Sequence, residues 1–217
     1  LVIFILRRKT VRGNDVLILG LCNSGKTLLF TRLLVNKVVD TYISVKENKS
    51  SLTFNNHKSL NIIDIPGSDS IRLRIFDQYI LFIFRAIIFL IDGSTIQKEI
   101  KNAAEYLYTV LTDNLIMSNQ VPLLIACNKQ DLGFAKGSTL IKSALEKELN
   151  QLRHTKSAAL DGVDGKSSTS NCLGNPRKDF SFSDLKKNET QFIEISCKRI
   201  NEDSSDVESV KEWISNV

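Results

Sequence analysis

One stretch of the sequence has the residue types and the spacing to hold phosphate groups. Residues 20–27 read Gly-Leu-Cys-Asn-Ser-Gly-Lys-Thr, which is the G-x-x-x-x-G-K-T pattern of a phosphate-binding loop. In such a loop, backbone N–H groups surround the phosphate oxygens, Lys26 neutralises the β and γ phosphates, and the Thr27 hydroxyl coordinates Mg²⁺. The residues expected to contact the nucleotide here are Gly20, Asn23, Ser24, Gly25, Lys26, Thr27 and Leu28.

An acidic residue that could complete a Mg²⁺ site follows in the stretch Asp64-Ile65-Pro66-Gly67. A carboxylate at the end of an apolar strand can reach the metal through a water molecule. The backbone N–H of Gly67 is free to meet a γ-phosphate, and such a contact can order the segment that follows. Turns also favour Asp, so this pattern is weak by itself and gains its meaning from the phosphate-binding loop before it.

A third pattern, Asn128-Lys129-Gln130-Asp131, has the chemistry to select guanine. The Asp131 carboxylate can accept hydrogen bonds from N1–H and the 2-amino group of guanine, a donor pair that adenine lacks. Asn128 is expected to tie this segment to the phosphate-binding loop, and the stem of Lys129 to lie over the base. The stretch Ser196-Cys197-Lys198 resembles an element whose backbone N–H faces guanine O6. The expected ligand is therefore GTP or GDP with Mg²⁺.

The elements that must position these residues alternate between short apolar runs and helical patterns. Apolar runs predict strands at 15–19, 51–54, 60–63, 86–91, 123–127 and 192–195, with a hairpin through Asn55 and Asn56. Helical spacing of apolar residues predicts helices at 26–34, 96–111, 141–152 and 207–214. This order predicts an α/β fold of the P-loop NTPase type, a three-layer sandwich with a mostly parallel sheet and helices on both faces.

The domain organisation is predicted to be one nucleotide-binding domain over residues 13–217 with a single insertion. From about residue 153 to 187 the composition shifts to Ser, Gly, Asn, Asp and Lys. So polar a segment buries too little apolar surface to order itself, which predicts a flexible loop. Phe180, Phe182 and Leu185 near its end could dock on the domain or on a partner.

Composition narrows the classes of function. The 217-residue chain is 42% hydrophobic, with a net charge of +5 and a pI near 9.0. This balance indicates either an acidic partner, such as an anionic membrane surface, or an ordinary mildly basic surface. Direct nucleic-acid binding is not expected, because the basic residues are scattered. Cys22, Cys127, Cys172 and Cys197 form no CxxC pair, which fits free thiols in a reducing compartment.

The first twelve residues combine an apolar run with basic side chains. Residues 1–6 read Leu-Val-Ile-Phe-Ile-Leu, and Arg7, Arg8, Lys9 and Arg12 follow. Six apolar residues cannot span a bilayer, which needs about twenty, but they fit the end of a truncated transmembrane helix. Basic residues directly after such a helix place the following domain in the cytoplasm. A short strand or an unstructured tail is the alternative.

Together these motifs resemble those of the Ras-like small GTPases, and within them the beta-subunit family of the signal recognition particle receptor. The narrower resemblance rests on residues 20–34, 64–74, 124–132 and 140–153 and on the insertion that follows. It implies an anchor in the endoplasmic reticulum membrane through one N-terminal helix, with the GTPase domain facing the cytosol. It also implies that the GTP-bound form binds the N-terminal domain of the receptor alpha subunit and so tethers the targeting machinery. The expected contact regions are the switch loops at 40–50 and 65–78, which sense the γ-phosphate.

Two positions depart from the Ras-like pattern. Ser68 stands where a Gln normally orients the attacking water, and its hydroxyl is too short for that role. Very slow intrinsic hydrolysis is expected, and no catalytic residue is assigned. In the first switch, where a Thr normally supplies Mg²⁺ with a hydroxyl, the spacing leaves Thr41, Ile43 and Ser44 as alternatives. Ile43 could not do this. The Mg²⁺ candidates are therefore Thr27, Ser44 and Asp64, and Thr41 stays a further candidate if the register of the loop differs.

Two other functions use the same motifs. An Arf- or Sar-like trafficking GTPase would cycle by hydrolysis, but its amphipathic or myristoylated N-terminal helix does not match the run at 1–9. A pseudo-GTPase that holds nucleotide permanently, or none, would fit Ser68. The intact phosphate-binding loop and the Asn128–Asp131 segment count against a loss of binding.

Overall fold

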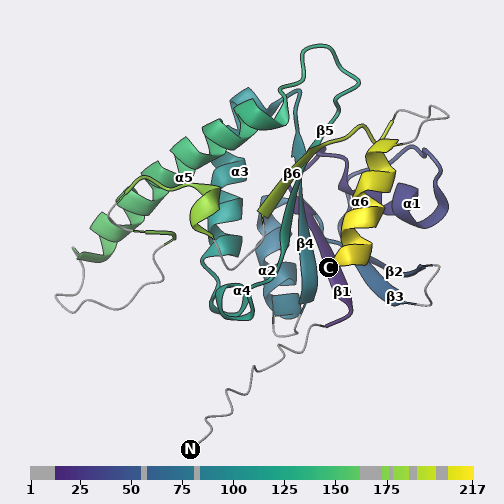
Figure 1. The fold of residues 1–217 in the computed structure, drawn as a ribbon, viewed down its shortest axis with the longest axis horizontal. Helices are drawn as coiled ribbons and strands as arrows, with labels where there is room; N and C mark the ends of the chain where they lie inside the picture. The colour runs from purple at the N-terminus through teal and green to yellow at the C-terminus, as the bar shows by residue number, and fades with distance from the viewer. Residues whose placement is uncertain are drawn as a thin grey trace, which may run out of the picture.

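The computed structural model describes residues 13–54, 58–80, 84–161, 173–175, 178–185, 190–198 and 205–217. Its centre is a six-stranded sheet in the order β2-β3-β1-β4-β5-β6 (Figure 1). All neighbouring strands pair in parallel except β2, which runs antiparallel to β3 at one edge. The strands are β1 Asp15–Gly20, β2 Asn48–Thr53, β3 Ser59–Asp64, β4 Phe84–Asp92, β5 Leu123–Asn128 and β6 Thr190–Glu194.

Helices cover both faces of this sheet, which makes three layers. The helices α2, α3 and α5 lie on one face, and α1 and α6 lie on the other (Figure 1). The short helix α4 follows α3 directly. The helices are α1 Lys26–Val35, α2 Asp69–Ile80, α3 Ile96–Leu111, α4 Asn114–Asn119, α5 Ser138–Asp161 and α6 Ser205–Asn216, with a short 3₁₀ helix, η1, at Phe182–Asp184.

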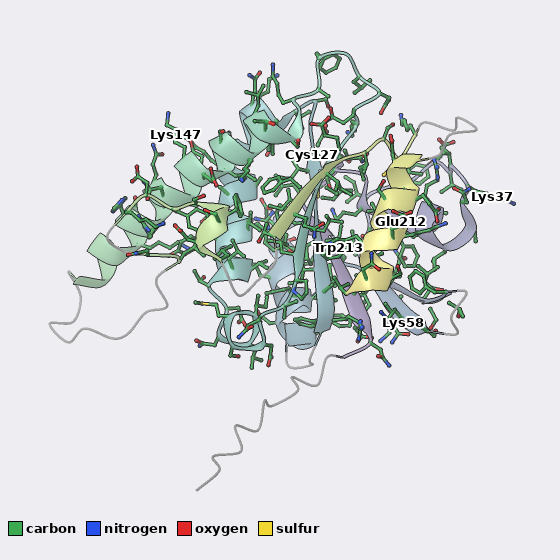
Figure 2. All side chains as sticks on the ribbon, viewed as in Figure 1. Lys37, Lys58, Cys127, Lys147, Glu212 and Trp213 are labelled. Atoms are coloured by element: carbon green, nitrogen blue, oxygen red, sulfur yellow. The ribbon has the colours of Figure 1, made fainter. Side chains whose placement is uncertain are left out.

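The central strands are buried on both sides because their side chains alternate between two apolar layers. In β4, Ile87 and Phe89 join the cluster under α3 and α5, whereas Ile88 joins the cluster under α1 and α6. Figure 2 shows side chains filling the space beside the sheet, where Cys127 and Trp213 lie, while Lys147 projects from the outer side of α5. The two clusters hold the strand ends in fixed positions.

The predicted α/β architecture is confirmed. Each predicted strand and helix is present, the helix at 96–111 with the predicted bounds and the others with shifted ends. The second and third strands pair as an antiparallel hairpin, although its connecting residues 55–57 lie outside the described part of the chain. The sequence patterns do not predict the helices α2 and α4. Helix α4 is short and capped by Asp113, and α2 begins within the segment interpreted above as a switch loop.

The start of the predicted insertion loop is wrong, because α5 continues to Asp161 and so includes residues 153–161. The Arg153 side chain connects α5 to the segment after it. Its guanidinium donates to the carbonyl oxygens of Asn175 and Lys178 at 2.8 and 2.7 Å. The sequence around 180–182 is also ordered, since Phe180 and Phe182 are buried and pack edge-on at 5.3 Å. Composition predicts neither the end of α5 nor the ordered segment around 180–182, because it does not reveal that one buried Arg can hydrogen-bond to several backbone carbonyls. Residues 162–172, 176–177 and 186–189 lie outside the described part.

The prediction of an N-terminal membrane anchor falls on residues 1–12, which lie outside the described residues. Within the described residues, no helix combines the length and the apolar character needed to cross a membrane. Cys22, Cys127 and Cys197 are free thiols, and Cys172 lies outside the described part.

Candidate functional site

The loops that follow β1, β3, β5 and β6 meet at one edge of the sheet around a cleft of about 340 Å³. This is the edge where ligands bind in open α/β sheets, because the parallel strands all end there. The cleft is lined by Cys22, Asn23, Gly25, Lys26, Thr27, Leu28, Thr41, Tyr42, Ile43, Ser44, Pro66, Gly67, Asn128, Lys129, Asp131, Leu132, Cys197 and Lys198.

The loop between β1 and α1 needs its glycines for close approach. Gly25 has φ = 97°, and a Cβ there would lie 2.4 Å from Nδ2 of Asn128. A Cβ on Gly20 would lie 2.3 Å from the carbonyl oxygen of Leu90. No side chain caps the N-terminus of α1, so its first N–H groups remain available to an anion.

Lys26 is held at the bottom of this loop with little access to water. Its Nζ donates to the carbonyl oxygen of Leu21 at 2.7 Å. Burial lowers the pKa of Lys26 to about 8, against the opposing attraction of Asp64. Gly67 approaches from the other side, since a Cβ on it would lie 2.6 Å from Lys26 Nζ and 2.6 Å from Cys22 N. A buried cation beside free N–H groups is suited to an incoming phosphate.

Three oxygen-bearing side chains from three separate segments meet beside Lys26. The Thr27 hydroxyl donates to Oδ2 of Asp64 at 2.7 Å and lies 3.2 Å from Oγ of Ser44. Nδ2 of Asn48 also donates to this Asp64 oxygen, at 3.0 Å. Of the three alternatives in the first switch, Ser44 is therefore the one that reaches Thr27. The side chain of Ile43 is 62% exposed.

The environment of Asp64 fits a Mg²⁺ ion. The residue is fully buried, and burial raises its pKa, although the hydrogen bonds from Thr27 and Asn48 act the other way. Its second oxygen, Oδ1, has no hydrogen-bond partner among the described residues. A divalent cation nearby would stabilise the ionised carboxylate. One carboxylate beside two hydroxyls suits Mg²⁺, since this ion takes phosphate and water oxygens as further ligands.

The side of the cleft formed by the segments after β5 and β6 is organised by Asn128. Its Nδ2 donates to the carbonyl oxygen of Ser24 at 2.8 Å, and its Oδ1 accepts from the backbone N–H of Cys197 at 3.0 Å. Asn128 thus joins the phosphate-binding loop to the loop after β6. Burial raises the pKa of the Cys197 thiol to about 12, so this residue acts there through its backbone.

The neighbouring residues of this segment are also held in place. Lys129 has φ = 66°, and its Nζ donates to Oδ2 of Asp92 at 2.6 Å. The motifs in the sequence do not single out Asp92, although an acidic residue directly after a buried strand is a usable signal. Asp131 lines the cleft and accepts a 2.5 Å hydrogen bond from the Ser196 hydroxyl, which restrains its carboxylate.

Most of the residues predicted from the motifs line the cleft. The predicted residues that do not line it directly are Gly20, Ser24, Asp64, Ser68 and Ser196. Gly20, Ser24 and Ser196 act through the backbone or by holding a neighbour, and Ser68 lies at the start of α2 with its Oγ 3.1 Å from that of Ser70. Sequence reasoning missed Cys22, Tyr42, Pro66 and Leu132, because the motif patterns specify no residue type at these positions.

A fold and a site of this kind define the small GTPase class of P-loop proteins. The family model described as the signal recognition particle receptor beta subunit matches residues 11–189, so the chain belongs to that family. This confirms the resemblance found in the sequence.

Known relatives agree with this assignment. The signal recognition particle receptor subunit beta of Rattus norvegicus is 42% identical over 218 residues, which cover 99% of this chain and 80% of the relative. The solved mammalian receptor structure is 40% identical with a TM-score of 0.79, covering 93% of this chain and 98% of that one. The receptor SRb-GTP/SRX complex from Chaetomium thermophilum, at 21% identity, has a TM-score of 0.75 over 93% of this chain and 99% of that one, which shows the fold alone.

Replacing Asn128 by Ala is expected to lower the free energy of unfolding by about 1–3 kcal/mol. The change leaves the buried carbonyl of Ser24 and the buried N–H of Cys197 without their partner. Urea unfolding followed by circular dichroism measures this. The matched change Asn102→Ala removes an exposed amide on α3 that donates to Glu99 in the same helix, and should stay within about 0.5 kcal/mol of the parent. Equal stability of the two variants would contradict the role of Asn128.

Proposed function

We propose that the chain is a GTP-binding, membrane-anchored receptor subunit that tethers the receptor alpha subunit for co-translational protein targeting. The GTP-bound domain faces the cytosol at the endoplasmic reticulum membrane and holds the N-terminal domain of the alpha subunit. The observation that carries the proposal is the meeting of Ser44, Thr27 and Asp64, because it links the first switch directly to the Mg²⁺-binding residues.

Different residues of the chain bind the phosphates, the Mg²⁺ ion and the guanine base. Lys26 and the free N–H groups at the start of α1 hold the phosphates. Thr27, Ser44 and Asp64 would hold Mg²⁺, which neutralises phosphate charge when bound. Asp131, restrained by Ser196, selects guanine.

The segment around Ser44 is suited to report the nucleotide state to a protein partner. Tyr42 and Val45 beside it are 91% and 74% exposed, so the residue that reaches Thr27 is flanked by apolar side chains in water. Exposed apolar residues next to a ligand-sensing loop favour a protein contact there. Support also comes from the solved relative described as an SRb-GTP/SRX complex.

Asp131→Ala is expected to weaken GTP binding about a hundredfold and to remove the preference for GTP over ATP. The change deletes a carboxylate that accepts two guanine hydrogen bonds, and the lower value of about 1.5 kcal/mol for each corresponds together to roughly a hundredfold. Competition against a fluorescent guanine nucleotide in Mg²⁺ measures both affinities. Asp179→Ala, which changes an exposed carboxylate beside Asn150, should bind as the parent does. A retained preference for GTP would refute the role given to Asp131.

Intrinsic GTP hydrolysis is expected to be very slow, at or below about 10⁻⁴ s⁻¹, because Ser68 cannot orient the attacking water as a Gln does. Single-turnover hydrolysis of bound GTP measures the rate, and Ser68→Gln should raise it several-fold. Ser70→Gln places the same side chain two residues further on and should leave the rate unchanged. A parent rate well above that of an intrinsic Ras-like reaction would favour a GTPase that cycles by hydrolysis.

Val45→Asp is expected to weaken capture of the alpha subunit's N-terminal domain at least tenfold in the GTP state. Val45 is 74% exposed and does not line the cleft, so the new charge meets the partner rather than the nucleotide. Leu140→Asp is the control, since Leu140 is 63% exposed on α5, away from both switches. Binding to the immobilised partner domain is measured after confirming equal GTP content. Unchanged capture by Val45→Asp would remove this surface from the proposal.

A further inference from the structure

Arg72 on α2 is a buried cation, although Arg side chains are mostly exposed in folded proteins. It is 8% exposed, and its guanidinium carbon lies 4.6 Å from the centre of the Tyr106 ring on α3. Ile75 and Phe76 follow it on the same face of α2 and pack into the core, whereas Leu73 is exposed. The side of α2 that contacts the domain therefore begins with an Arg rather than an apolar residue.

Tyr106 offers its ring, not its hydroxyl, to this contact. The residue is 1% exposed, and its hydroxyl has no hydrogen-bond partner among the described residues. Its ring also packs against Phe89 of β4, with ring centres 5.5 Å apart. A cation over the face of a desolvated ring is attracted by the electrons of that face. The Tyr106 ring therefore packs against the sheet on one side and contacts the Arg72 guanidinium on the other.

The contact lies one helical turn from the residue that approaches the phosphate site. The backbone N–H of Arg72 donates to the carbonyl oxygen of Ser68 at 2.9 Å, and its side chain contacts the Asp69 carboxylate. Ser68 directly follows Gly67, where a Cβ would lie 2.6 Å from Lys26 Nζ. The first turn of α2 is therefore joined to Gly67 through Ser68.

We propose that Arg72 is a positioning residue for γ-phosphate binding. Its contact with Tyr106 holds the first turn of α2 against the domain, and so keeps the N–H of Gly67 beside Lys26 and the phosphate-binding loop. The proposal rests on the GTP binding proposed above. Because GDP has no γ-phosphate to meet Gly67, loss of the contact weakens GTP binding and leaves GDP binding largely intact.

The test measures the affinities of a non-hydrolysable GTP analogue and of GDP, in Mg²⁺, for the whole chain and its variants. Tyr106→Leu and Arg72→Gln should each lower analogue affinity about tenfold and GDP affinity less than twofold. Tyr106→Phe keeps the ring face and should behave as the parent. The double variant should be no weaker than either single variant, because both remove the same contact.

A matched control lies two residues away on α3. Tyr108 is 8% exposed and its ring sits under Lys156 Nζ at 4.8 Å, so Tyr108→Leu removes a ring–cation contact made with α5 rather than α2. It should leave the ratio of the two affinities unchanged. Urea unfolding of each variant shows whether it is folded. If Tyr106→Leu does not fold, the comparison of Arg72→Gln with Arg72→Lys tests the proposal. Arg72→Lys keeps a positive charge and should recover part of the affinity for the GTP analogue.

The outcomes separate this proposal from the one it rests on. If the parent binds neither guanine nucleotide, the proposed function fails. If the parent binds both and the variants lose both equally, or if Tyr106→Phe loses as much analogue affinity as Tyr106→Leu, the positioning role of Arg72 is overturned.

Discussion

The carboxylate of Asp64, fully buried at the end of β3, is the constraint on which the rest of the site depends. An ionised group in such a place is costly unless it is hydrogen-bonded or beside a cation. Thr27 and Asn48 satisfy one oxygen, which fixes the start of α1 and the start of β2 relative to β3. Ser44 then joins through Thr27, so a single buried carboxylate organises the loops at this end of the cleft.

Much of the fold and of the candidate site could be predicted from the sequence, because each motif lies at the end of a strand that the apolar pattern also predicts. The phosphate-binding loop, Asp64 and the Asn128–Asp131 segment each lie at the end of a strand, and parallel strands bring their ends to one edge. The alternation of strands and helices is therefore enough to place distant motifs together. The binding residues lie on backbone turns that only a few residue types allow, as Gly25 shows.

The features that could not be predicted depend on side chains meeting across the fold. Spacing alone leaves Thr41, Ile43 and Ser44 open, because the path of the chain after α1 is set by contacts with Thr27 rather than by local pattern. The polar composition after residue 152 predicts a loop, yet one buried Arg153 gathers several backbone carbonyls and extends the ordered region. Apolar spacing does not predict helix α2, because the face of this helix that packs on the domain begins with a charged residue, Arg72.

The bridge made by Asn128 has a consequence for how the site can vary in evolution. Both of its partners, the carbonyl of Ser24 and the N–H of Cys197, are main-chain atoms. The bridge is therefore indifferent to which side chains stand at positions 24 and 197, provided that the backbone keeps its course. The sequence dependence of the link falls on the amide of residue 128, which offers a donor and an acceptor at once, and on Gly25, where a Cβ would lie 2.4 Å from Nδ2 of Asn128. Changes of side chain in the two joined loops are therefore compatible with a fixed distance between these loops.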